Sequence, residues 1–170
     1  HFSIPNQHSP TAEAAVRLVM ELKDAAMGHS NLDERHRVIV AQDACMKRNF
    51  SLGYEHRINR VVQYVIPGSL GTVSLPKPQR DVLRIPKGCP RNLLCCIIGA
   101  DPETSNGVYV ELAVDRRSVK DRKAGRGKKK REVMITVVNF WCIRQYDELA
   151  HGRKRSVLHE ERAVNRGNES

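Results

Sequence analysis

The chain has 170 residues, of which 40% are hydrophobic and 28% are charged, and its formal net charge at pH 7 is +10. This length allows one folded domain with a hydrophobic core, or such a core with a small helical annex. No apolar run approaches the roughly 18 residues that a membrane span requires, so the sequence predicts a globular protein without a transmembrane segment.

Residues 1–8 are expected to form an extended arm, because they contain Pro5 and are closely followed by Pro10. They lack both the charged and the apolar region of a signal peptide, so we expect none there. A start at His1 rather than at a methionine suggests a piece of a longer chain or polyprotein.

Three amphipathic patterns predict helices within residues 9–66. Ser9 and Pro10 suit a helix start, and apolar residues then recur at helical spacing until Gly28, which suits a C-cap. A second helix is expected from about residue 32 to 48, with acidic residues in its first turn and basic ones in its last. Residues 54–66 favour a third helix, although their β-branched content also permits a strand.

Short strands are expected after Pro67, where prolines and glycines break the chain. "TVSL" (72–75) and "DVLRI" (81–85) are predicted to be edge strands. Three stronger strand patterns follow at 92–99, 107–115 and 132–143. The last is apolar on both faces, which predicts a central strand with Phe140 and Trp141 in the core.

These patterns predict an α+β fold in which N-terminal helices (9–66) pack on a mostly antiparallel sheet (70–145) with a long basic hairpin loop. The expected boundaries are a single α+β domain over residues 9–150 and a flexible basic tail over residues 151–170.

Nearly all of the net charge lies in one segment between two predicted strands. Residues 115–131 hold ten basic and two acidic side chains and contribute +8 of the total +10. Such a segment suits phosphate contacts, because each Lys or Arg releases counterions from a nucleic acid. The candidate nucleic-acid-binding residues are Arg116, Arg117, Lys120, Arg122, Lys123, Arg126, Lys128, Lys129, Lys130 and Arg131, with Arg153, Lys154 and Arg155 from a smaller cluster in the tail.

Two other interpretations of the basic segment remain open. Arg116 and Arg117, followed after ten residues by Lys128, Lys129, Lys130 and Arg131, match the spacing of a bipartite nuclear localisation signal, which an import receptor would bind. Alternatively, the segment is only a solvated hairpin tip. The remaining basic residues, Arg57, Arg60, Lys77, Arg80, Arg84, Lys87 and Arg91, are scattered along the chain and are expected to form a generally solvated surface.

The sequence offers few features of an enzyme. The five cysteines form no CxxC spacing, and the seven histidines form no HExxH pair, so we expect neither a metal site nor a cofactor, and no catalytic residue is assigned. A Cys hydrolase built on Cys45 or Cys89 and a metal nuclease built on Asp101, Glu111 and Asp115 remain as alternatives. Free cysteines favour a reducing compartment, hence the nucleus or the cytoplasm.

The function predicted from the sequence is phosphate-directed binding of RNA or DNA with little sequence preference, by a non-enzymatic protein that enters the nucleus. Aromatic residues make up only 5% of the chain, so backbone contacts are favoured over base stacking. The alternative is a viral structural protein of matrix or capsid type that forms homo-oligomers, with the basic loop touching genome or anionic membrane.

Overall fold

The computed structural model describes residues 10–30, 32–53, 59–127 and 131–145. Within them lie the α-helices α1 (Pro10–Ser30), α2 (Arg37–Ser51), α3 (Lys77–Val82) and α4 (Val119–Lys123), and the strands β1 (Leu70–Ser74), β2 (Asn92–Ala100), β3 (Gly107–Asp115), β4 (Arg131–Asn139) and β5 (Ile143–Gln145). Three 3-10 turns complete the described elements: η1 (Glu34–His36), η2 (Val62–Tyr64) and η3 (Phe140–Cys142). The predicted arm (1–8) and tail (151–170) lie outside the described residues.

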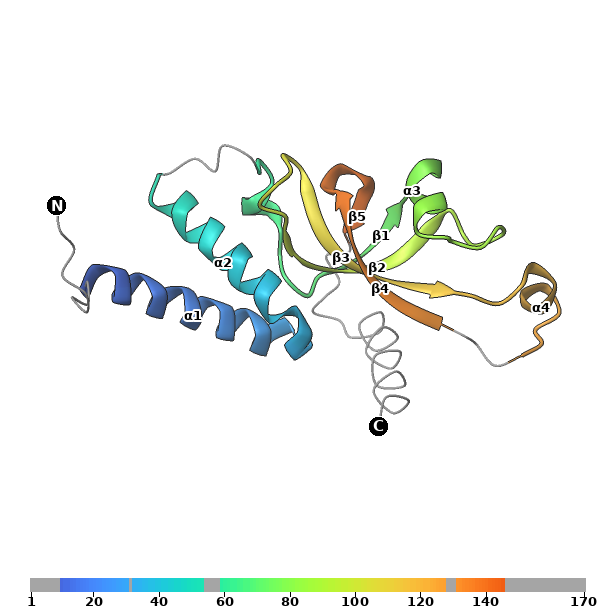
Figure 1. Ribbon diagram of the computed structural model, residues 1–170, viewed down its shortest axis with the longest axis horizontal. Coiled ribbons are helices and arrows are strands. Elements are labelled where there is room, and N and C mark those ends of the chain that lie inside the picture. Colours follow the sequence, from blue (N-terminus) through green and yellow to red (C-terminus); the bar gives the residue numbers. More distant parts are fainter. Residues whose placement is uncertain (1–9, 31, 54–58, 128–130, 146–170) are drawn as a thin grey trace, which may run out of the picture.

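The five strands form one antiparallel sheet in the order β4-β3-β2-β1-β5. The helices α1 and α2 lie together at one end of the molecule, and β3 and β4 extend away from them towards α4 at the other end (Figure 1). The predicted α+β class, with N-terminal helices and an antiparallel sheet, is confirmed. In the part of the chain that the structure describes, no helix is both long and apolar enough to cross a bilayer.

Apolar side chains cover both faces of the sheet. On one face Leu32 and Val40, from the helical region, pack with Leu70, Cys96 and Ile98 of the strands. The opposite face carries the larger cluster, in which the alternate residues of β3 pack with β2 and with the segment 59–65. This two-sided burial explains why β2 is a continuous apolar run.

The helix α2 approaches β2 closely at Gly99. A Cβ atom there would lie 3.1 Å from Cβ of Asp43 and 3.2 Å from the carbonyl oxygen of Ile39, so only glycine fits without displacement. Asp43 fixes this contact, since its Oδ1 accepts the N–H of Ala100 at 3.0 Å and its Oδ2 lies 2.5 Å from Nζ of Lys47. Burial raises the pKa of Asp43, although Lys47 opposes the shift.

A second buried carboxylate ties the helical region to β3. Glu111 is 0% exposed and accepts a hydrogen bond from the guanidinium of Arg35, while Nε2 of the buried His36 lies 3.4 Å from the same carboxylate oxygen. The N–H of Asp33 donates to Nδ1 of His36 at 3.1 Å, so Nδ1 is an acceptor and Nε2 faces the carboxylate of Glu111. Charged groups therefore hold the helical region to the sheet.

Both long N-terminal helices are confirmed with shifted ends. The first continues past the predicted C-cap Gly28 to Ser30, whose hydroxyl donates to the carbonyl of Ala26. The second begins at Arg37, because η1 precedes it and makes the first turn after Asp33.

The predicted third helix at 54–66 is wrong over its described part. Residues 59–66 contain only η2, and Val61, Val62 and Val65 are all buried against the sheet. The side-chain amide of Asn59 donates to the carbonyls of Asp101 at 2.8 Å and Gly107 at 3.0 Å, which fixes this segment in an irregular path. Packing, rather than helical periodicity, thus accounts for the spacing of the valines.

Three strand predictions also need correction. "DVLRI" is not a strand, because Pro76 and Pro78 start the helix α3, which runs to Val82. "TVSL" is not at an edge, because β1 pairs with both β2 and β5.

The segment 132–143 is not a single central strand. Instead β4 ends at Asn139 and is an edge strand, with Ile135 40% exposed. The side chain of Asn139 accepts the N–H of Trp141 and so starts η3, which turns Trp141 out of the core.

Candidate nucleic-acid interface

The basic segment contains a short helix that the sequence did not predict. Ser118 caps α4, since its Oγ accepts the N–H of Asp121 at 3.1 Å. After Ala124 the chain turns through Gly125 at φ 63°, the N–H of Arg126 donates to the carbonyl of Asp121, and the N–H of Gly125 donates to that of Arg122. This pairing is a Schellman motif, and it orders the segment between β3 and residue 127.

Three of the predicted binding arginines bond to their own chain. Arg122 donates to the carbonyl of Lys87 and to the sulfur of Cys89. Arg116 donates to the carbonyls of Leu83 and Arg84, and its Nε lies 2.6 Å from the carboxylate of Glu132. These arginines attach the loop after α3 to the β3–β4 connection.

Arg117 forms an ion pair with Asp115. Its guanidinium donates to both carboxylate oxygens, at 2.7 to 3.1 Å. These hydrogen bonds lower the pKa of Asp115 to about 2, so the carboxylate remains charged and balances Arg117 at neutral pH. The first of the two clusters proposed for nuclear import is therefore occupied by intramolecular contacts.

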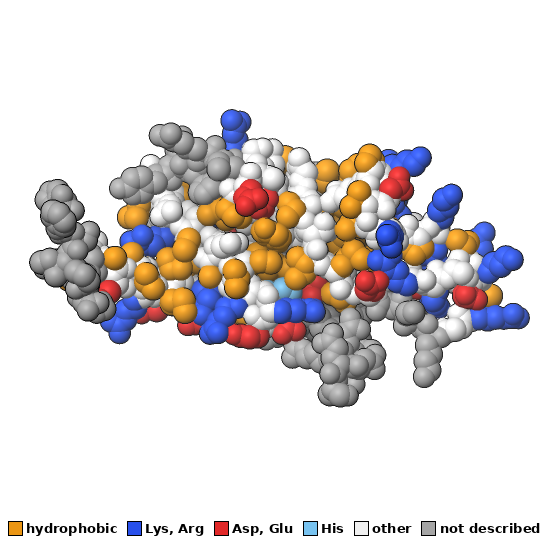
Figure 2. Space-filling view, in the orientation of Figure 1, with side chains coloured by type: hydrophobic (Ala, Val, Ile, Leu, Met, Phe, Trp, Pro, Cys, Tyr) orange, Lys and Arg blue, Asp and Glu red, His pale blue; other side chains and the backbone are white. Residues whose placement is uncertain are grey.

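The structure brings basic residues from a second segment to the same place. Arg116 donates to the carbonyl of Arg84, and Arg122 donates to that of Lys87, so Arg84 and Lys87 lie beside the β3–β4 connection. The side chains of Arg84 and Lys87 are exposed. Both were expected to belong to a generally solvated surface; they are exposed, and the fold places them next to the basic segment. We call the exposed cations of this region the basic end: Arg84, Lys87, Lys120, Lys123 and Arg126. Figure 2 shows blue side chains gathered over the end of the molecule that carries α4.

Arg84 has an unusual backbone conformation. Its φ is 51°, and it is the one residue other than glycine with a positive φ in the described part of the chain. It follows the C-cap of α3, where the N–H of Ile85 donates to the carbonyl of Arg80 and the N–H of Arg84 to that of Asp81. Glycine usually fills this position of a Schellman motif, as Gly125 does after α4, and another residue costs about 1 kcal/mol. Because the strained conformation is kept with an arginine rather than a glycine, we infer a functional role for the side chain of Arg84.

The remaining predicted binding residues are only partly described. Arg131 is the first residue of β4 and pairs with Asp115 across the ladder. Six predicted residues lie outside the described residues: Lys128, Lys129, Lys130, Arg153, Lys154 and Arg155. The sequence missed Arg84 and Lys87, because only the folded chain places them beside α4.

The carboxylates considered for a metal nuclease lie in separate environments. Asp101 accepts the hydroxyl of Thr104, Glu111 binds Arg35, and Asp115 binds Arg117. Over the described ranges, no three side chains of His, Cys, Asp or Glu are grouped in a way that suits a metal ion.

The two cysteines considered as alternative nucleophiles lie in different surroundings. Cys89 is buried beside Arg122, and Cys45 is exposed on α2. Within the described ranges, none of the five cysteines is in a disulfide.

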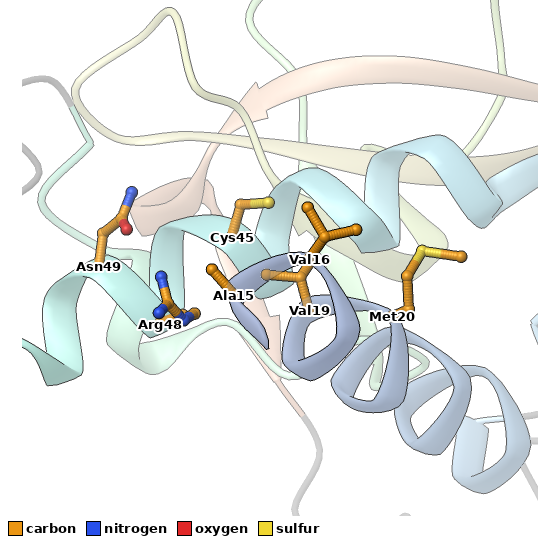
Figure 3. Close-up of a pocket in the computed structure, with 7 residues that line it drawn as sticks. All are labelled: Ala15, Val16, Val19, Met20, Cys45, Arg48 and Asn49. Carbon is orange, nitrogen blue, oxygen red and sulfur yellow. The ribbon is translucent and has the colours of Figure 1, made fainter. Parts of the chain in front are cut away.

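An apolar hollow of about 330 Å³ lies at the helical end, between α1 and α2 (Figure 3). Its lining residues are Ala15, Val16, Val19 and Met20 from α1, and Cys45, Arg48 and Asn49 from α2. The hollow is thus lined by different elements from those of the basic end.

Comparison of the chain with models of protein families, with curated proteins and with solved structures finds no match.

Proposed function

We propose that this chain is a non-enzymatic nucleic-acid-binding protein whose basic end contacts the phosphates of RNA or DNA. The observation that carries the proposal is the convergence of exposed cations from two distant segments, 84–87 and 120–126. Two neighbouring carboxylates, Asp115 and Glu132, are bound by Arg117 and Arg116 rather than by cations of the basic end, whereas Asp121 lies on α4 itself and accepts the hydroxyl of Ser118.

The arrangement supports contacts to phosphate rather than base-specific recognition. Lys120 and Lys123 are exposed on a single helical turn, and Arg126 is exposed just after it. Within the described residues, none of the three is held in a network that would orient it towards a base edge. Such contacts give affinity that falls steeply with salt concentration and depends little on sequence.

A salt titration with a matched control tests the proposal. Binding of labelled RNA, DNA and anionic lipid vesicles is measured for the wild type and for two double variants. Lys120→Ala with Lys123→Ala removes two charges from the basic end, and Arg17→Ala with Arg37→Ala removes two from the helical end. We expect the first pair alone to lower the slope of log affinity against log salt by about 2.

The outcomes separate the alternatives. If both double variants weakened binding equally, the effect would depend only on the net charge of the protein, which would contradict a local interface at the basic end. Preference for vesicles over both nucleic acids would replace the proposed ligand by a membrane surface.

Nuclear import is proposed as a separate use of the same segment. Arg116 and Arg117 are engaged in ion pairs with Glu132 and Asp115, so a receptor would have to open these contacts before binding them. A fluorescent fusion in which both are replaced by Ala should lose nuclear accumulation while the purified variant still binds nucleic acid. Unchanged nuclear accumulation would contradict import through this signal.

The exposed apolar residues of α1 favour a second candidate function, an assembly protein of the kind considered from the sequence. Val16 is 63% exposed, and Leu18, Met20 and Leu22 are each more than 40% exposed. Light scattering after size exclusion should show an oligomer that Val16→Glu with Met20→Glu dissociates. A monomeric wild type at all concentrations would contradict this candidate.

A further inference from the structure

The end of β4 opposite the basic end carries exposed aromatic rings, contrary to the expectation that Trp141 lies in the core. Trp141 is 68% exposed and Tyr64 is 52% exposed. Phe140 lies between them, with its ring centroid 6.3 Å from that of Tyr64 and 5.2 Å from that of Trp141. We call these three residues the aromatic shelf.

Local contacts hold the shelf in place. The N–H of Trp141 donates to the side chain of Asn139 at 3.0 Å, and the N–H of Phe140 donates to the carbonyl of Asn106 at 2.8 Å. Phe140 meets Trp141 edge to face, with an angle of 80° between the rings. The indole is therefore supported on a fixed turn while most of its surface is open to solvent.

Two exposed arginines belong to segments that continue from the shelf or contact the same turn. Arg144 follows Trp141 by three residues on β5. Arg60 donates its backbone N–H to Ser105, the neighbour of the Asn106 that binds Phe140, so Arg60 and Phe140 contact the same turn. An open aromatic surface beside cations is the combination that stacks nucleobases and holds their phosphates.

We propose that the aromatic shelf stacks bases of a single-stranded nucleic acid, with Trp141 as the main stacking residue and Arg60 and Arg144 contacting the adjacent phosphates. This inference rests on the proposed nucleic-acid-binding function and specifies its ligand. In a duplex the bases are stacked on each other, so only an unpaired base can present its face to the indole. A ligand that also contacts the basic end must extend along the nine residues of β4, roughly 27 Å.

The chain itself carries the reporter for the experiment, because Trp141 is its one tryptophan. Trp141 fluorescence is recorded during titration with single-stranded oligonucleotides of about 4 and about 16 nucleotides, a duplex of the longer sequence, and heparin, a polyanion without bases. Affinities of Trp141→Ala and Trp141→Phe are measured by anisotropy of the labelled strands. Thermal unfolding of both variants checks that the exposed position leaves the fold intact.

The expected result is quenching of Trp141 by single strands, stronger for the longer one, with little effect of heparin or duplex. Trp141→Ala should bind the long single strand about tenfold more weakly, and Trp141→Phe should recover most of the affinity, because a phenyl ring still stacks. Heparin binding should be the same in all three proteins.

Each contrary outcome has a distinct meaning. If the single strands bind without quenching Trp141, and bind Trp141→Ala as tightly as the wild type, the proposed role of the shelf is contradicted. The proposed binding by the basic end would then still stand. Equal quenching by duplex and single strand overturns the single-stranded ligand. If no oligonucleotide binds at all, the proposed function fails, and the inference fails with it.

Discussion

The helical end and the basic end of the molecule use charge in opposite ways. Near the helices, Asp43 and Glu111 are buried and bonded to cations and backbone groups of the same chain. At the basic end, Lys120 and Lys123 are exposed on a short helix held by neighbouring arginines. Buried charges are costly to leave without partners, so the first group stabilises the fold, whereas the second is available to a ligand.

The comparison predicts its largest effect on stability at Asp43. Asp43→Ala should lower the free energy of unfolding by about 3 kcal/mol, because the buried N–H of Ala100 loses its acceptor and Lys47 loses its carboxylate. Urea denaturation measures this loss. Asp121→Ala, at the exposed start of α4, is the control and should cost less than about 1 kcal/mol. Similar losses in both variants would remove the distinction between the two ends.

The second prediction compares Arg122, which is bonded within the chain, with Lys120, whose exposed side chain belongs to the basic end. Arg122→Ala should destabilise the protein by about 1 kcal/mol, because it releases the loop around Lys87 and Cys89. Lys120→Ala should leave the unfolding midpoint unchanged and weaken nucleic-acid binding instead. Urea denaturation and a binding titration of both variants at one salt concentration give the comparison. The reverse pattern would mean that the hydrogen bonds of Arg122 to Lys87 and Cys89 do not stabilise the loop.

The third prediction concerns Arg84, where stability and binding should change in opposite directions. Arg84→Gly should raise the free energy of unfolding by about 1 kcal/mol, since glycine adopts the positive φ without strain. The same variant should bind nucleic acid more weakly. Arg84→Ala separates the two effects, because it loses the charge and keeps the strain. Unchanged binding in both variants would exclude Arg84 from the interface.

The smallest effect is expected at acidic pH, where the pKa shifts of Asp115 and Asp43 have opposite signs and change stability in opposite directions. The folded-state pKa of Asp115 is about 2, below its ordinary 3.8, so its contribution is present above pH 3.8 and is lost as the pH falls towards 2. The pKa of Asp43 is raised by burial, so the protonation-dependent part of its contribution is largest below pH 3.8 and falls as the pH rises through the folded-state pKa, while its hydrogen bond to Ala100 remains.

Thermal unfolding between pH 2 and pH 5 tests this difference. Asp115→Asn should lose stability less steeply than the wild type as the pH falls. Asp43→Asn should lose it more steeply, because it lacks the stabilisation that protonation of Asp43 gives. Parallel curves for all three proteins would show that neither carboxyl contributes as described.

The strands of the sheet could be predicted because local pattern and burial agree. The segment 107–115 alternates apolar and other residues, and β3 has those bounds with alternate side chains in the core. The edge position of β4 could not be predicted, because apolar residues on both faces are typical of a central strand. Only the turn at Asn139 and the pairing of β5 with β1 decide where the sheet ends.

The candidate site was predicted in part for the same kind of reason. Lys120, Lys123 and Arg126 follow from a local excess of charge, which composition alone reveals. Arg84 and Lys87 join them only through the hydrogen bonds of Arg116 and Arg122 across more than 30 residues of chain. Trp141 was expected in the core because its neighbours are apolar, and a single capping side chain turned it outwards.

The sequence by itself determined the class of the fold, the two long helices, the strands β2 and β3, and the position of the basic segment, since each depends on a short-range pattern of apolar or charged residues. Only the tertiary structure decided which arginines are bonded within the chain, which cations converge at the basic end, and which aromatic rings are exposed. These outcomes depend on contacts between segments that are distant in sequence, and no local periodicity records them.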